Sequence, residues 1–388
     1  MTKFSRIFII FCLSLFSTVV MANVEPVATT AVAASSEVVA SSESTPKEGA
    51  VAEPKEDASA EVVEHIMNHV ADANEFHIAT INGHHYSLGL PCIILRDGKL
   101  SFFSSSEFHH QEVIDGFKLD HHTGRVVDAA TGNRSANIVS YFTAKDSSKF
   151  IDLSITKNVF TSLLGFLILA VILIGVARAY AKDNTKAPKG MQSALEPIIN
   201  YLVDDVIKQN IGPKYEKFVP FLLSVFFFIL INNLIGLIPF FPGSANASGN
   251  IAFTFVIAII AFIIININGN KSYWGHIFAM PGVPKWVLII LTPVEIVGLF
   301  IKPIALMLRL FGNITGGHIA ILSIVSLIFI FGKMGQSVGG ASLGGGMAIP
   351  IVLFVNAMEL FVAFLQAYVF TLLTSIFIGA AVEEHEHH

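Results

Sequence analysis

The sequence predicts an all-α membrane protein with about five transmembrane helices, the last two long and tilted, plus one interfacial amphipathic helix. A small, mostly-β exported domain is expected before them. Hydrophobic residues make up 53% of the 388 residues and charged residues only 14%, against about 25% in ordinary soluble domains. The mean hydropathy is +0.66. Long charge-free segments follow residue 150, whereas residues 62–150 show short alternating runs separated by turn sequences.

Residues 1–22 have the features of a secretory signal peptide. Lys3 and Arg6 form a basic start, residues 7–20 an apolar core, and Val20-Met21-Ala22 a small-residue cleavage sequence. An uncleaved anchor helix is the alternative, but the apolar run is short for a transmembrane span. Residues 23–61 contain no aromatic residue and are rich in Ala, Val, Ser, Glu and Pro, so a disordered acidic linker is expected.

Residues 62–150 are predicted to form the exported domain, with turns at Asn82-Gly83, Asp97-Gly98 and Thr123-Gly124. Once the signal peptide is removed, Cys92 is the only cysteine, so no intramolecular disulfide can form. The domain holds nine histidines, and His65 and His69 lie one helical turn apart. A surface metal site is one interpretation, but no cysteine or carboxylate cluster stands at ligand spacing. We therefore expect exposed histidines, with no metal and no cofactor.

The membrane domain is expected over residues 151–382, and its first span over residues 158–177. The next segment is basic, and basic loops stay in the cytoplasm. Its seven cationic residues are Arg178, Lys182, Lys186, Lys189, Lys208, Lys214 and Lys217. The first span therefore runs inward from the exported domain. Residues 191–211 place their apolar side chains on one face, which predicts the interfacial helix.

Residues 218–270 contain no charged residue, and the Pro239-Phe240-Phe241-Pro242-Gly243 break divides them into a transmembrane hairpin of residues 219–238 and 251–268. The next apolar segment, residues 286–331, would reach about 69 Å as one helix. The hydrocarbon core is only about 30 Å thick. This segment must be steeply tilted, broken or partly outside the bilayer.

A glycine-rich stretch, residues 332–346, precedes the last apolar segment, residues 347–380. Residues 383–388 are expected to form a short cytoplasmic tail.

Arg309 stands alone inside apolar sequence. A guanidinium at bilayer depth costs from about 2.5 to more than 10 kcal/mol, so it needs a function. Snorkelling to the headgroups fits poorly because apolar sequence continues on both sides. Glu295, Lys302 and Arg309 recur every seven residues and share one helical stripe. Asn313, one turn further on, joins that stripe.

The last segment also carries polar residues on one face, namely Asn356, Glu359 and Gln366. In an antiparallel hairpin, the numbers of residues at equal depth have a nearly constant sum. A turn near residue 338 therefore pairs Arg309 with Gln366, and His318 with Glu359 nearer the outside. His and Glu exchange protons near neutral pH and Arg does not, so the pattern predicts an ion path with a barrier. The alternative for Asn313 and Gln366 is hydrogen bonding between helices.

Several of these sequences resemble subunit a of the F-type ATP synthase, over roughly residues 150–380. They are Arg309-Leu310-Phe311-Gly312-Asn313, Lys302-Pro303, Asn233-Leu234-Ile235-Gly236-Leu237-Ile238-Pro239 and the segment from Glu359 to Gln366. The resemblance implies two proton half-channels against a rotor ring of c subunits, and contact with peripheral-stalk b subunits. The implied localisation is the bacterial inner (plasma) membrane, with the exported domain in the periplasm and the C-terminus in the cytoplasm.

The resemblance also implies roles for individual residues. Arg309 would drive deprotonation of each passing rotor carboxylate, Gln366 and Asn313 would assist, and Glu295 would lie on the cytoplasmic exit path. The residues expected to act in proton translocation are Arg309, His318, Glu359, Gln366, Asn313, Glu295, Asn233, Lys302 and Asn356. Many bacterial members of that family carry Glu where this chain has His318, and His where it has Glu359. Some also carry Asp where this chain has Gly236, which leaves Asn233 as the nearby polar group.

Two other classes of protein remain as alternatives. A secondary ion transporter would place an Arg/His/Glu site at the midplane on broken helices, but the spans are few and no internal repeat is visible. A structural membrane anchor would leave the intramembrane ionisable residues without a function. The chain has no phosphate-binding glycine loop, so a non-catalytic subunit is expected. It has no basic stripe interleaved with aromatics, so nucleic acid is not an expected partner. The expected partners are membrane lipid and a transported proton, which His318 favours over sodium.

Overall fold

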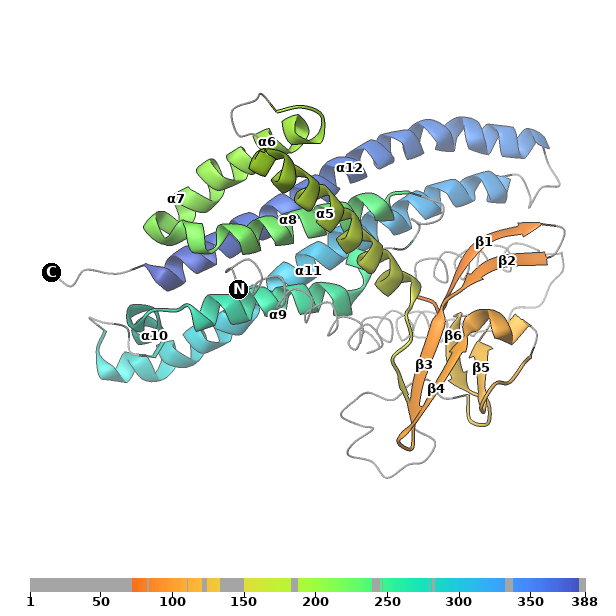
Figure 1. Ribbon diagram of the computed structural model, residues 1–388, viewed down its shortest axis with the longest axis horizontal. Helices are drawn as coiled ribbons and strands as arrows, with labels where there is room; N and C mark the ends of the chain where they lie inside the picture. Colours follow the sequence, from red (N-terminus) through yellow and green to blue (C-terminus); the bar gives the residue numbers. More distant parts are fainter. Residues whose placement is uncertain are drawn as a thin grey trace, which may run out of the picture.

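The computed structural model shows a β-rich domain at one end of a bundle of membrane-type helices (Figure 1). It describes residues 72–81, 84–109, 111–120, 124–132, 150–182, 188–238, 245, 247–278, 280, 283–331 and 338–383. The predicted signal peptide, the predicted linker, and His65 with His69 lie outside the described residues.

The described part of the N-terminal domain consists mainly of antiparallel strands in three small sheets. The strands are β1 (Glu75–Ile81), β2 (His84–Gly89), β3 (Pro91–Arg96), β4 (Lys99–Ser104), β5 (Phe117–Asp120), β6 (Arg125–Asp128) and β7 (Phe150–Asp152). A short 3-10 helix, η1 (Ser105–His109), follows β4. The predicted turn at Asp97-Gly98 connects β3 to β4, and both residues have positive φ angles, as a tight hairpin requires.

Side chains from the β4-β3-β7 sheet, the β5-β6 sheet and η1 meet in one small core, because alternate residues of β3 and β5 point inward. Phe117 and Phe150 are almost completely buried and pack edge to face. The Arg96 guanidinium lies over the Phe117 ring and forms an ion pair with Asp128. Cys92 is fully buried in this core, where burial raises the pKa of its thiol to about 12.

Four described helices are long and apolar enough to cross a membrane: α5 (Lys157–Lys182), α8 (Val219–Gly236), α11 (Lys285–Phe331) and α12 (Val338–Val382). A fifth span is possible if α9 (Ile251–Ile267) and α10 (Lys271–Phe278), which meet at an angle of 104°, count as one. The expected all-α membrane architecture is therefore present. The structure contains no membrane, so the number of crossings rests on length and composition.

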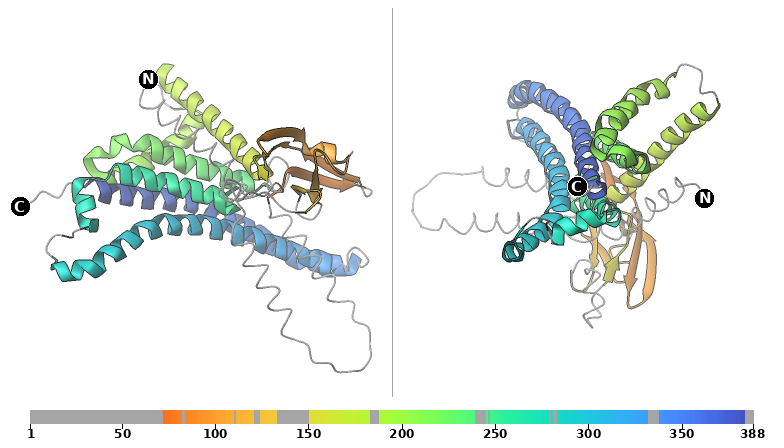
Figure 2. Two further views of the ribbon diagram at one scale, coloured as in Figure 1. Left: turned by 90° about the horizontal axis from the view of Figure 1, so that it is seen from below. Right: turned by 90° about the vertical axis from the view of Figure 1, so that its left-hand side faces the viewer.

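The bundle is organised around α8, whose Leu222, Phe226 and Ile229 are fully buried. The α5 and α12 helices pack against it, and α9 contacts it where the centres of the Phe253 and Phe228 rings lie 5.7 Å apart (Figures 1 and 2). Asn232 of α8 lies against Gly165 of α5, where a Cβ would come within 3.2 Å of the amide. Close packing of this kind uses small residues at membrane helix interfaces.

The basic segment after α5 forms α6 (Met191–Tyr201), a π-helical stretch η2 (Leu202–Ile207), α7 (Lys208–Ile211) and a 3-10 helix η3 (Gly212–Lys217). The predicted helix over residues 191–211 is therefore present, although its middle is π-helical, and its place at the membrane interface stays a prediction. Its buried side chains face the bundle, and Gly379 of α12 touches the backbone of Asn210 so closely that a side chain has no room. In Figure 1, α7 and α10 lie at the end of the bundle opposite the β-rich domain.

The α11 and α12 helices are each continuous, with 47 and 45 residues, and they pack side by side as an antiparallel hairpin. Residues 286–331 were expected to be steeply tilted, broken or partly outside the bilayer. The expectation of a break is wrong, because α11 passes through Pro293 and Pro303 without interruption. Figure 2 shows that it curves. The glycine-rich turn is shorter than expected, because α12 begins at Val338 and not near Met347. Backbone groups at membrane depth must pair within a helix, which favours helix over loop even for glycines.

Candidate ion path

The His318 and Glu359 side chains meet between α11 and α12. Nδ1 of His318 lies 3.1 Å from Oε1 of Glu359, and the side chains are 15% and 3% exposed. The antiparallel pairing predicted from the residue numbers is therefore confirmed at this position. The second carboxylate oxygen, Oε2, is buried and has no hydrogen-bond partner among the described residues. A buried acceptor without a partner costs about 1–3 kcal/mol.

Gly317 makes space for this contact. A Cβ at this position would lie 3.0 Å from Oε1 of Glu359, closer than nearly all real contacts. A Cβ added at the neighbouring Gly316 would meet no atom within 4 Å. The sequence analysis missed Gly317, although a glycine pair directly before an intramembrane histidine is a signal of close helix approach.

Lys302 supplies a second point of register between the two helices. Its Nζ lies 5.2 Å from the centre of the Phe377 ring, which is within cation–π range. Between this contact and the His318–Glu359 pair, the residue numbers fall on α11 as they rise on α12. Arg309 therefore lies near the depth of Gln366, as predicted.

Arg309 and Gln366 nevertheless differ in their surroundings. Gln366 is 4% exposed, whereas Arg309 is exposed. Among the described residues, no hydrogen bond joins them. The expectation that Arg309 faces Gln366 therefore holds for depth, while the two side chains differ in burial.

The remaining residues predicted for the ion path also differ in their exposure. Lys302 and Asn313 of α11 are exposed, and Glu295 is partly exposed, so the predicted stripe with Arg309 runs along an open side of the helix. Asn356 is exposed although Glu359, three residues later, is buried. Large apolar side chains surround the open stripe, among them Leu308 and Ile304.

Asn233 of α8 is buried and binds across the bundle. Its Nδ2 donates to the carbonyl oxygen of Ala363 at 3.1 Å, and its Oδ1 accepts from the Ser248 hydroxyl at 2.5 Å. Ser248 belongs to η4 (Ala247–Gly249), in the connection between α8 and α9. Thr315 donates to the carbonyl oxygen of Gly249 at 3.5 Å.

The η4 segment therefore contacts α11 directly and is linked to α12 through Asn233 of α8. Thr315 precedes His318 by one helical turn, and Ala363 follows Glu359 by one turn. Only Asn233 was predicted. Ser248 and Thr315 were missed because ordinary hydroxyl residues far apart in sequence give no signal of meeting.

A buried His–Glu contact and an exposed arginine on two long antiparallel helices define a multi-pass membrane protein with ionisable groups at bilayer depth. Comparison with known proteins identifies the family. A family model described as ATP synthase A chain matches residues 159–379, more than half of the chain, and the chain belongs to this family. A second model, for a domain of unknown function, matches residues 65–153.

Similar proteins include ATP synthase subunit a of Chloroherpeton thalassium, which is 42% identical over 242 residues. That match covers 61% of this chain and 69% of the relative. ATP synthase subunit a of Chlorobium phaeobacteroides is 40% identical over 242 residues, covering 61% and 67% of the two chains. The protein of the same name from an Anaeromyxobacter species is 38% identical over 246 residues, covering 61% and 56%.

Proposed function

We propose that the chain is the stator subunit of an F-type ATP synthase that forms two offset proton half-channels against a rotor ring of c subunits. In this role it couples proton flow to rotation and ATP synthesis and performs no covalent chemistry itself. The observation that carries the proposal is the buried His318–Glu359 pair with an exposed Arg309 further along the same helix. Nine residues separate His318 from Arg309, a rise of about 13.5 Å.

The outer half-channel is assigned to the end of the bundle that carries the β-rich domain. His318 and Glu359 lie on that side of Arg309, and each can take up and release a proton. Asn233 donates to the carbonyl oxygen of Ala363, which lies one helical turn from Glu359 on α12. These side chains would pass protons inward to the depth of the rotor carboxylate.

Arg309 is the proposed barrier between the half-channels. A guanidinium stays charged at physiological pH, so no proton can use it as a relay. In the described part of the chain, Arg309 forms no ion pair, and its exposed side points away from the bundle. A cation at membrane depth is stabilised by an acidic partner, and a rotor carboxylate would be that partner. Asn313 and Gln366 would assist at the same depth, and Asn356 nearer the outer end.

The inner half-channel would run from Arg309 toward α10. Lys302 and Glu295 continue the Arg309 stripe in this direction, each seven residues before the last. Both side chains reach solvent or partner surface, which suits an exit path. The basic residues of α6 to η3 lie at this end, and the positive-inside rule places them in the cytoplasm. The peripheral-stalk b subunits and membrane lipid would cover the remaining apolar surface.

The test is purification of the intact complex followed by transport in vesicles. The proposal predicts that the chain co-purifies with a ring of small c subunits, and that Arg309→Ala abolishes ATP-driven proton pumping. Arg178→Ala is the matched control, because Arg178 is an exposed arginine on α5. Proton transport by the chain alone, without the ring, would instead support a secondary transporter. Replacement of protons by sodium as the pumped ion would contradict the assignment of His318 as a relay.

A further inference from the structure

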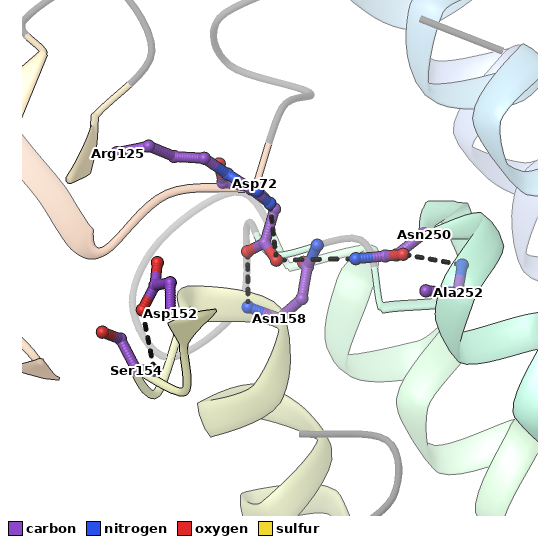
Figure 3. A network of polar contacts seen from close by, with 7 residues as sticks. All are labelled: Asp72, Arg125, Asp152, Ser154, Asn158, Asn250 and Ala252. Carbon is purple, nitrogen blue, oxygen red and sulfur yellow. Dashed lines mark hydrogen bonds and ion pairs between the residues drawn. The ribbon is translucent and has the colours of Figure 1, made fainter. Parts of the chain in front are cut away.

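Asp72 lies at the junction between the β-rich domain and the membrane helices (Figure 3). Its side chain is 5% exposed. One carboxylate oxygen accepts from the backbone N–H of Asn158 at 3.2 Å, and the other accepts from the Asn250 side chain at 3.5 Å. Arg125 of β6 lies 3.5 Å from the carboxylate, and its Nε donates to the Asp72 carbonyl oxygen at 3.1 Å.

This carboxylate binds the first turns of two membrane helices. Asn158 is in the first turn of α5, where backbone N–H groups lack helical partners and the helix dipole favours a negative charge. Asn250 caps α9, because its Oδ1 accepts from the N–H of Ala252 at 2.9 Å. Its Nδ2 is then available to donate to Asp72.

Apolar contacts reinforce the same junction. Phe76 of β1 packs edge to face on Phe160 of α5, with ring centres 5.6 Å apart. Leu90 and Ala245 are buried in the same cluster. Ala245 belongs to the connection between α8 and α9, so polar and apolar groups of the β-rich domain both hold this connection.

The connection leads directly to the candidate ion path. The Ser248 hydroxyl donates to Asn233 of α8, which in turn donates to the Ala363 carbonyl oxygen of α12. The Gly249 carbonyl oxygen accepts from Thr315 of α11. A continuous series of contacts therefore runs from Asp72 to both helices of the His318–Glu359 pair. Residues that act together in proton transfer must be held to within about 0.5 Å, which a loose connection does not provide.

We infer that the β-rich domain positions the His318–Glu359 pair, with Asp72 as the positioning residue that fixes residues 247–250, between α8 and α9. This inference rests on the proposed function, because the pair must lie on the proton path for its position to matter. It gives the N-terminal domain a role at the outer end of the path, where protons reach His318.

Asn250 provides a test that preserves the helix cap. Asn250→Asp keeps an acceptor for Ala252, since Asp caps helices as well as Asn, but it replaces the donor to Asp72 by a second carboxylate. Asp72→Asn leaves one side-chain oxygen at residue 72, whereas the Asn158 N–H and the Asn250 side chain each need an acceptor there. The double variant Asp72→Asn with Asn250→Asp restores both bonds, because the new amide donates to residue 250 and still accepts from Asn158.

The measurement is passive proton conduction in vesicles, per assembled complex, as a function of pH. Each single change is expected to slow conduction about tenfold, since a misplacement of about 1 Å costs up to 100-fold in rate, and to shift the pH at half-maximal conduction. The double variant should recover most of the rate and the parent pH profile. The α8 and α9 helices carry no ionisable side chain, whereas Asp152, Lys157 and Arg125 lie near Asp72 at the junction.

Two controls separate the possible failures. Glu112→Gln changes an exposed acidic residue of the same domain and should leave conduction unchanged. His318→Ala tests the proposed function itself and should block conduction. If His318→Ala blocks conduction while both single variants keep the parent rate and pH profile, the positioning role is wrong. Equal loss in the single and double variants, or loss of assembled complex without any change per complex, would also overturn it.

Discussion

Exchange of the His318–Glu359 pair is the sharpest perturbation that the structure offers. The two side chains are 3.1 Å apart, and Glu359 is almost fully buried. Removal of one partner leaves the other buried polar group without its hydrogen bond, which costs about 1–3 kcal/mol of folding free energy. A positioned acid or base contributes about 100-fold to 10,000-fold to proton transfer. His318→Ala and Glu359→Ala should therefore each slow passive proton conduction by about 100-fold or more.

The exchanged variant, His318→Glu with Glu359→His, should recover at least about a tenth of the parent rate, because the relay again has one acid and one base. Recovery should be partial, since an imidazole on α12 must fit beside Gly317. The assay is passive conduction and ATP-driven pumping in membrane vesicles. His276→Ala and Glu216→Ala, at exposed positions outside the pair, are matched controls. Parent-like conduction and pumping by both single variants would mean that the pair is a structural contact off the path.

Three further outcomes are expected. Gly317→Ala should slow conduction severalfold while Gly316→Ala does not, because a Cβ only at residue 317 meets the Glu359 carboxylate; equal rates would contradict the close approach. Cysteines at residues 302 and 377, or at 318 and 359, should cross-link with short reagents far better than cysteines at 302 and 359; preferential linkage of the last pair would mean that the register is wrong. Peptide mass spectrometry should show that alkylation of Cys92 at pH 8 requires denaturant, since burial raises the thiol pKa to about 12; rapid labelling of the folded chain would refute that burial. The sign of the same shift means that the domain loses stability as pH rises above 9.0, where the unfolded thiol ionises.

The sequence predicts the helical elements well because membrane spans depend on local composition. The hairpin break after α8, the length of α11 and the pairing of His318 with Glu359 all follow from apolar runs and one turn. The start of α12 at Val338 was missed, because glycine disfavours helices in water but the demand for backbone pairing dominates in a membrane.

Orientation around the helix axis was harder to predict than depth. Gln366 and Arg309 lie near one depth, yet Gln366 is buried and Arg309 is exposed. Asp72, Ser248 and Thr315 gave no local signal. Their contacts bring together segments far apart in the chain, and only the folded structure shows them.

The central claim is that Arg309 separates two half-channels and makes proton flow depend on rotation. The most direct measurement compares ATP-driven pumping in inverted vesicles with passive proton conduction after the catalytic head is removed, for Arg309→Ala and Arg309→Lys. The account predicts no coupled pumping by either variant, since a desolvated lysine ammonium can lose its proton where a guanidinium cannot, and a passive leak through Arg309→Ala. Normal coupled pumping by either variant would contradict the account.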